Sequence, residues 1–74
     1  MILGTFKGIR VDYDPERDIF NFEGDRFGTG GMAGDEVRGV RDALEGIDSQ
    51  WAAETFKIVD AAVRAAATLK EAKT

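Results

Sequence analysis

Carboxylates at alternate positions are the first residues of this chain that could do chemistry. Within twelve residues they occupy the first, third, fifth, seventh and twelfth places: Asp12, Asp14, Glu16, Asp18 and Glu23. Oxygen ligands at this spacing are typical of a calcium-binding loop. The pattern therefore makes weak calcium binding one of the functions to be weighed.

The spacing resembles the loop of an EF-hand, over these twelve residues alone. The sixth place, where such a loop turns sharply and needs glycine, is Arg17, and Pro15 occupies the fourth. EF-hand loops join two helices, whereas residues 9–13 and 19–22 alternate between apolar and polar side chains, as strands do. We therefore expect a solvated hairpin turn and assign no metal ligand.

A glycine-rich run at residues 28–33 formally matches the dinucleotide-binding fingerprint, and it precedes a predicted helix. A dinucleotide fold needs a second parallel strand after that helix, but the chain continues as helix. Asp35 and Glu36 would also repel a phosphate from the start of the helix. We expect a flexible connection and no cofactor.

Composition removes the commonest catalytic groups. The 74 residues include no histidine and no cysteine, so the most frequent general base, metal ligand and thiol nucleophile are all missing. Among the many carboxylates, no two stand out in the sequence as a catalytic acid/base couple rather than as part of a solvated surface. We therefore expect no enzyme and no catalytic residue.

Charge is concentrated in the first two thirds of the chain. The net charge is −4, and residues 12–48 hold eleven Asp and Glu against four Arg. Such an acidic segment favours a protein partner with a basic or mixed surface and disfavours direct contact with nucleic acid. Neither a signal peptide nor a membrane-spanning segment is expected, and the lack of cysteine favours a cytoplasmic location.

Two strands are predicted over residues 9–13 and 19–22, joined by a turn at 14–17. Phe6 is out of step with the first strand, and we interpret Gly8 as a bulge that returns Phe6 to the buried face.

A third, short strand at residues 26–29 is expected to follow a hairpin loop. It would carry one of four rings that we expect in the core rather than on a nucleic-acid platform: Tyr13, Phe20, Phe22 and Phe27.

The predicted fold is one α+β mini-domain over residues 1–74. A small antiparallel hairpin or three-stranded meander (1–29) is followed by a Gly-rich connection (30–34), a short helix (35–46) and a long Ala-rich C-terminal helix (49–72). Val37, Val40 and Leu44 form the apolar face of the short helix. Gly46 is expected to end it in a left-handed conformation, and Asp48 or Ser49 to cap the long helix.

The long helix is apolar around most of its circumference, apart from one polar ridge. Two apolar seams can be traced on it, and so small a chain has little with which to cover both. We therefore expect a second copy on the seam that includes Ile58, Ala62, Ala65 and Leu69, giving a homo-oligomer, most simply a dimer. Trp51 is expected in the core, with an interface position as the alternative.

These observations favour a noncatalytic, small acidic protein-protein interaction module that self-associates through its C-terminal helix. The expected partner-binding residues are the acids of the hairpin region and the single tryptophan: Asp12, Asp14, Glu16, Asp18, Glu23, Asp25 and Trp51.

Two alternatives are kept. The first is an inhibitor that blocks a basic nucleic-acid-binding protein by DNA mimicry, with carboxylates in place of phosphates. In size and charge the chain is similar to small acidic phage inhibitors, including some anti-CRISPR proteins. The second is weak calcium binding.

Overall fold

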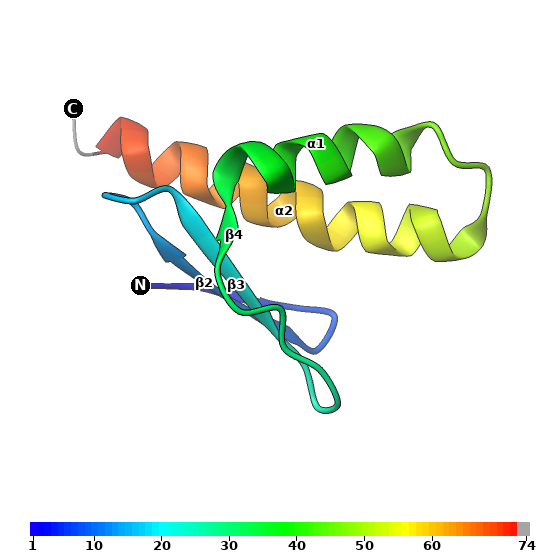
Figure 1. Cartoon of the computed structure of the whole chain (residues 1–74), viewed down its shortest axis with the longest axis horizontal. Helices are drawn as coiled ribbons and strands as arrows, with labels where there is room; N and C mark the ends of the chain where they lie inside the picture. The colour runs from blue at the N-terminus through cyan, green and yellow to red at the C-terminus, as the bar shows by residue number, and fades with distance from the viewer. Residues whose placement is uncertain (73–74) are drawn as a thin grey trace.

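The chain forms a four-stranded antiparallel sheet followed by two helices, which confirms the predicted α+β class. The computed structural model describes residues 1–72; residues 73 and 74 of the expected domain lie outside the described residues. The elements are β1 (Ile2–Phe6), β2 (Ile9–Asp14), β3 (Ile19–Glu23), β4 (Met32–Ala33), α1 (Gly34–Glu45) and α2 (Gln50–Ala72). Figure 1 shows the two helices side by side on one side of the sheet.

Strand β1 was not predicted as a separate element. Lys7 and Gly8 have φ values of 51° and 83° and form a two-residue turn that joins Phe6 to its pairing partner Ile9. A type I′ hairpin turn needs positive φ at both central residues, which glycine adopts without strain. The interpretation of Gly8 as a bulge was therefore wrong. The irregularity lies within β1, where the register shifts between Ile2 and Gly4.

The predicted third strand at residues 26–29 was also wrong. Gly28 makes an isolated bridge to Glu23, and Phe27 lies in a loop with 52% of its surface exposed. The fourth strand forms later, where Met32 pairs with Phe20. Glycines at residues 28–31 offer no side chains to pack on a sheet, so regular pairing resumes only where an apolar side chain is available again.

The inner face of the sheet supplies the aromatic part of the core. Val11 pairs with Phe22, and Tyr13 pairs with Phe20, so these four side chains project from the same face and are buried. The period-two alternation of residues 9–13 and 19–22 therefore predicted the buried face correctly. Phe27 is the exception among the four rings expected in the core.

The helix ends differ in how well they were predicted. Asp35 and Glu36 occupy the first turn of α1, where carboxylates are favourable. Gly46 ends α1 with φ −85°, so the predicted left-handed cap was wrong. Ser49 caps α2, because its Oγ accepts the Ala52 N–H at 3.0 Å. The short connection between Gly46 and Ser49 folds α2 back along α1.

Helix α2 is covered by its own chain more fully than the sequence suggested. It packs on α1 and also on β1 and β2. Residues of both predicted seams join the core. Val59, Val63 and Ala66 of one seam and Ala62 of the other are buried, and Phe56 and Leu69 are partly buried against them. Ala52, which belongs to neither seam, is buried as well. Because β1 was missed, its contribution to this cover was missed as well.

Trp51 is not a core residue. Its side chain is 66% exposed in the first turn of α2, which contradicts the preferred prediction. No helix within residues 1–72 combines the length and apolar character needed to cross a membrane.

Candidate functional site

The sheet and the helix pair form a wedge with two unlike ends. In Figure 1 the strands run away from the helices toward the two loops in the lower middle of the view. We call the narrow part, formed by Tyr13, Asp18, Arg38 and Lys70, the closed end. The wide part between the helices and the loop region is the open end. Each of these two ends holds a pocket.

The closed end is a network of polar contacts centred on Asp18. The Tyr13 hydroxyl donates to Asp18 Oδ1 at 2.5 Å, and Arg38 Nη2 donates to Asp18 Oδ2 at 2.8 Å. Arg38 also bonds Asp35 Oδ1 at 2.7 Å. Lys70 Nζ lies 3.4 Å from Asp18 Oδ1 and 5.9 Å from the centre of the Tyr13 ring. The network therefore ties β2 and the turn after it to both helices.

The electrostatics of the closed end match this pairing. Hydrogen bonds from Arg38 and then Tyr13 lower the pKa of Asp18 to about 2. Asp18 and then Asp35 raise the pKa of Arg38, and Tyr13 and then Asp18 raise that of Lys70. Burial, followed by the bond to Asp18, raises the pKa of Tyr13. These shifts hold every group in its ordinary charge state at neutral pH, which suits a structural cluster better than proton transfer.

Backbone geometry fixes Asp18 in place. It has φ 54°, and its carbonyl accepts the Gly34 N–H at 2.7 Å at the start of α1. A Cβ added at Gly34 would overlap the Asp18 carboxylate. Glycine is therefore required at this position because the carboxylate passes directly against the backbone of the helix.

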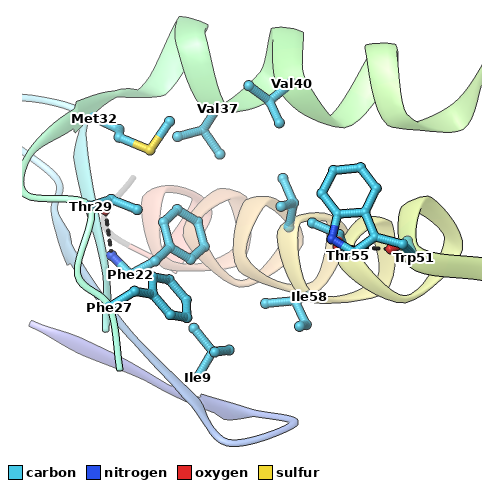
Figure 2. Close-up of a pocket in the computed structure, with 11 residues that line it drawn as sticks. Ile9, Phe22, Phe27, Thr29, Met32, Val37, Val40, Trp51, Thr55 and Ile58 are labelled. Carbon is cyan, nitrogen blue, oxygen red and sulfur yellow. Dashed lines mark hydrogen bonds between the residues drawn. The ribbon is translucent and has the colours of Figure 1, made fainter. Parts of the chain in front are cut away.

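The open end holds an apolar groove of about 440 Å³. Figure 2 shows its walls: Met32, Val37 and Val40 on one side, Ile9, Phe22 and Phe27 on another, and side chains of α2 on the third. The full lining is Ile9, Phe22, Phe27, Thr29, Met32, Val37, Val40, Trp51, Thr55, Ile58 and Val59. None of these eleven residues carries a charge. We call this space the apolar groove.

The hydroxyl groups in the lining are already engaged. Thr29 Oγ1 accepts the Phe22 N–H at 3.1 Å and donates to the Gly30 carbonyl at 2.9 Å. Thr55 Oγ1 donates to the Trp51 carbonyl at 2.8 Å. Both threonines therefore present mainly their methyl groups, and the groove offers apolar contact rather than specific hydrogen bonds.

Exposed apolar side chains surround the mouth of the groove. Trp51 and Phe27 are its two exposed rings, and Val40 is 38% exposed. Phe27 is held by its carbonyl, which accepts the Gly24 N–H at 3.0 Å, and its ring lies so close to Gly24 that a Cβ there would collide with it. The ring is thus positioned by its loop although water reaches half of it.

The predicted acidic residues do not form one site. Asp12 pairs with the N-terminal ammonium at 2.6 Å, which lowers its pKa, and Glu23 pairs with Arg10. Asp14 accepts the N–H groups of Glu16 and Arg17, and thereby stabilises the turn. Asp18 belongs to the closed end, whereas Glu16 and Asp25 are exposed at separate loops. No group of three or more possible metal ligands occurs in the part of the chain that the structure describes.

The four residues predicted for self-association lie along one side of α2 but in different environments. Ala62 is completely buried, Ile58 lines the apolar groove, and Ala65 and Leu69 are partly buried. The cover that we expected from a second copy is supplied in large part within the chain. Trp51 and Ile58 are the two predicted residues that the structure brings into one site.

Sequence reasoning missed most of the groove, including Ile9, Phe27, Met32 and Val40. Val40 was placed on the buried face of its helix together with Val37 and Leu44, and only its exposure marks it as part of an open wall. The feature of the sequence that could have indicated a groove is its surplus of apolar residues relative to the size of the chain.

Compared with models of protein families, with curated proteins and with solved structures, the chain gives no match.

Proposed function

We propose that the protein is a noncatalytic protein-interaction module that holds an apolar-faced segment of another protein in the apolar groove. The observation that carries this proposal is the groove itself, an uncharged space of about 440 Å³ with Trp51 and Phe27 exposed at its mouth. Contiguous exposed apolar surface on a small protein marks a binding surface more often than chance exposure does.

The chemistry of the groove lining supports binding of a macromolecule rather than catalysis. The groove contains no ionisable side chain, and its threonine hydroxyls are bonded to the backbone. The groups with shifted pKa values at the closed end are bonded to one another. A binding surface needs neither a nucleophile nor a general base, but it benefits from an aromatic anchor such as Trp51.

Selection of binders from a library of random peptides tests the proposal. We expect the selected peptides to be rich in large apolar residues and to bind the native protein far more tightly than a Val40→Asp variant. This variant places a charge on the partly exposed wall of the groove. Ala53→Asp is the matched control, because Ala53 is exposed on α2 but does not line the groove.

Equal binding of the selected peptides to the native protein and to Val40→Asp would contradict the proposal, provided that circular dichroism shows the variant to be folded. An absence of any selected binder would contradict it as well.

A further inference from the structure

We infer that the open edge of β1 pairs with the same edge of a second copy, which joins two sheets into one continuous antiparallel sheet. None of the residues of β1 lines the apolar groove, so the inference does not depend on the proposed function. Three features carry it: the unpaired backbone groups of β1, the exposed apolar side chains beside them, and one register that satisfies both.

The two edges of the sheet differ in length. The strand order is β1-β2-β3-β4, so β1 is paired on one side only, with β2. The opposite edge, β4, has two residues, whereas β1 has five, with neither a charged residue nor a proline among them. Shortness, charge and proline are common features by which edge strands avoid pairing with another chain. Strand β4 is protected by its length, and β1 by none of these three.

The hydrogen bonds at the two ends of β1 show which residues face β2. The Met1 ammonium donates to the Tyr13 carbonyl at 3.1 Å, and the Tyr13 N–H donates to the Met1 carbonyl at 2.8 Å. Phe6 pairs with Ile9 across a two-residue turn, a position that is hydrogen-bonded in hairpins of this kind. Met1 and Phe6 therefore direct their backbone groups toward β2.

Two residues between these ends direct their backbone groups away from β2. Hydrogen-bonded and non-hydrogen-bonded pairs alternate along an antiparallel ladder. Ile2, next to Met1, and Thr5, next to Phe6, are therefore the non-hydrogen-bonded members of β1. Neither makes a backbone hydrogen bond outside the β1–β2 ladder within residues 1–72. Each thus leaves one N–H donor and one C=O acceptor at the open edge.

Exposed apolar side chains lie beside these backbone groups. The side chains of Met1 and Ile2 are 59% and 57% exposed. The other exposed large apolar residues of the described chain line the apolar groove or lie in the connection between the helices. Unpaired backbone groups together with apolar side chains are what an added strand recognises at a sheet edge.

A second copy offers a register that uses all of the outward backbone groups. When two β1 strands run antiparallel, Ile2 of each copy can lie opposite Thr5 of the other, with the twofold axis between Leu3 and Gly4. The contact is then the same on both copies, as a twofold interface requires. Ile2 and Thr5 both direct their backbone groups outward, so each such pair can exchange two hydrogen bonds.

The same register matches the faces of the two sheets. Ile2 and Thr5 share the outer face, so an exposed isoleucine meets a β-branched residue. Met1 lies opposite Phe6 on the inner face, where it covers a ring that is only partly buried in its own chain. The exposed apolar surface of the edge is thus buried by the pairing that satisfies the backbone.

The charges near the edge do not oppose this pairing. The Met1 ammonium is neutralised by Asp12 at 2.6 Å. Lys7 is the nearest cation without an ion pair within residues 1–72. In this register Lys7 of each copy extends beyond the start of the other β1, beside the neutralised ammonium, and the two Lys7 residues lie at opposite ends of the paired strands. No two unpaired like charges are therefore brought side by side.

The assembly should be a weak dimer and should not grow further. Pairing uses the only β1 of each copy, and β4 is too short to add another strand. Five residues a side make a small interface, so we expect a dissociation constant between about 10 μM and 1 mM. Sedimentation equilibrium over a concentration series measures it, on protein that carries no extension before Met1.

A pair of substitutions at Thr5 tests the backbone. Thr5→Pro removes the outward N–H, which β2 does not use, and Thr5→Val keeps it together with the β-branched shape. Two hydrogen bonds are lost per dimer, so Thr5→Pro should raise the dissociation constant by at least about tenfold, and Thr5→Val by about threefold or less.

A second pair tests the position of the contact and does not rely on proline. Ile2→Lys places a charge on the edge, whereas Asn21→Lys places the same charge on the outer face of β3, away from the edge. Both side chains are exposed, so circular dichroism should show both variants folded. We expect Ile2→Lys to be monomeric at every concentration and Asn21→Lys to dimerise like the native protein.

Amide hydrogen exchange identifies the paired strand directly. Exchange at Ile2 and Thr5 should slow as the protein concentration rises, and a sample that mixes labelled and unlabelled copies should show magnetisation transfer from Ile2 of one copy to Thr5 of the other. A protein that stays monomeric up to about 1 mM would overturn the inference. A dimer that persists in folded Ile2→Lys, concentration-dependent changes centred on the apolar groove or on α2, or a mass that grows beyond the dimer would overturn it as well.

Discussion

The two ends of the wedge use opposite kinds of interaction. At the closed end one carboxylate, Asp18, is shared by Tyr13, Arg38 and Lys70, and it fixes the turn after β2 to both helices. At the open end, side chains of the same sheet and helices leave an uncharged groove between them. A small chain can thus keep apolar surface exposed at one end while a saturated polar network holds the other end together.

The largest effect should come from removing Tyr13. Its side chain is 1% exposed, so Tyr13→Ala should lower the free energy of unfolding by about 3–5 kcal/mol, a large part of the total for a domain of this size. Tyr13→Phe keeps the ring and removes the bond to Asp18, and should cost about 1–2 kcal/mol. Denaturant titration measures both. A decrease in the free energy of unfolding of less than about 0.5 kcal/mol for Tyr13→Phe would show that the hydroxyl contributes little to the closed-end network.

A pair of glycines in α1 gives the next test. Gly34→Ala should destabilise by about 1–3 kcal/mol, because the new methyl group would overlap the Asp18 carboxylate. Gly39→Ala meets open space and should stabilise the helix by up to about 1 kcal/mol. The midpoint temperature of thermal unfolding should thus fall for Gly34→Ala and rise for Gly39→Ala. A stabilising Gly34→Ala would mean that the helix start is not tightly packed on Asp18.

The pH dependence of stability should reveal Asp18. Its pKa is about 2 in the folded chain against an ordinary value of 3.8, so its contribution is fully present above about pH 4 and is lost as the pH falls toward 2. We expect about 1–2 kcal/mol, after allowance for the 30% of the side chain that water reaches.

Asp18→Asn should remove that contribution at neutral pH and flatten the profile between pH 4 and 2. Asparagine tolerates the positive φ at this position, so backbone strain is not introduced. Asp25→Asn is the exposed control. Parallel profiles for the native protein and Asp18→Asn would show that the closed end does not depend on this charge.

The smallest effect on stability is expected at the open end. Trp51→Ala should change the free energy of unfolding by about 0.5 kcal/mol or less, because most of the ring is in water. The same substitution should abolish measurable binding of the peptides selected for the apolar groove, as measured by calorimetry. A loss of several kcal/mol in stability would place Trp51 in the core after all and erase the contrast between the two ends.

Local patterns in the sequence predicted the fold class, the buried face of β2 and β3, and both helices. They failed where the outcome depended on the tertiary partner. Gly8 is compatible with a bulge or with a turn, and only the presence of β1 opposite β2 decides between them. Residues 26–29 could form a strand, yet the glycines that follow give no packing to hold it.

The candidate site was less accessible to sequence reasoning than the fold. The sequence indicated an apolar face of α2 that a second copy would cover at Ile58, Ala62, Ala65 and Leu69. In the structure Ala62 is buried within the chain and Ile58 lines the apolar groove. Whether Trp51 is exposed depends on the point at which the sheet diverges from the helices. The periodicity of apolar residues along the sequence does not predict that point. The acids were read as one surface, but Asp12, Asp18 and Glu23 are paired with cations from other parts of the chain.

The most direct test of the central claim is a map of backbone amide chemical shifts during titration with a peptide selected from the random library. We predict that the perturbed amides cluster around the apolar groove, at Phe27, Val40 and Trp51, and that Tyr13 and Asp18 at the closed end change little. Perturbations centred on the closed end or on the acidic turn at residues 14–17, or none at saturating peptide, would contradict the assignment of the groove as the docking surface.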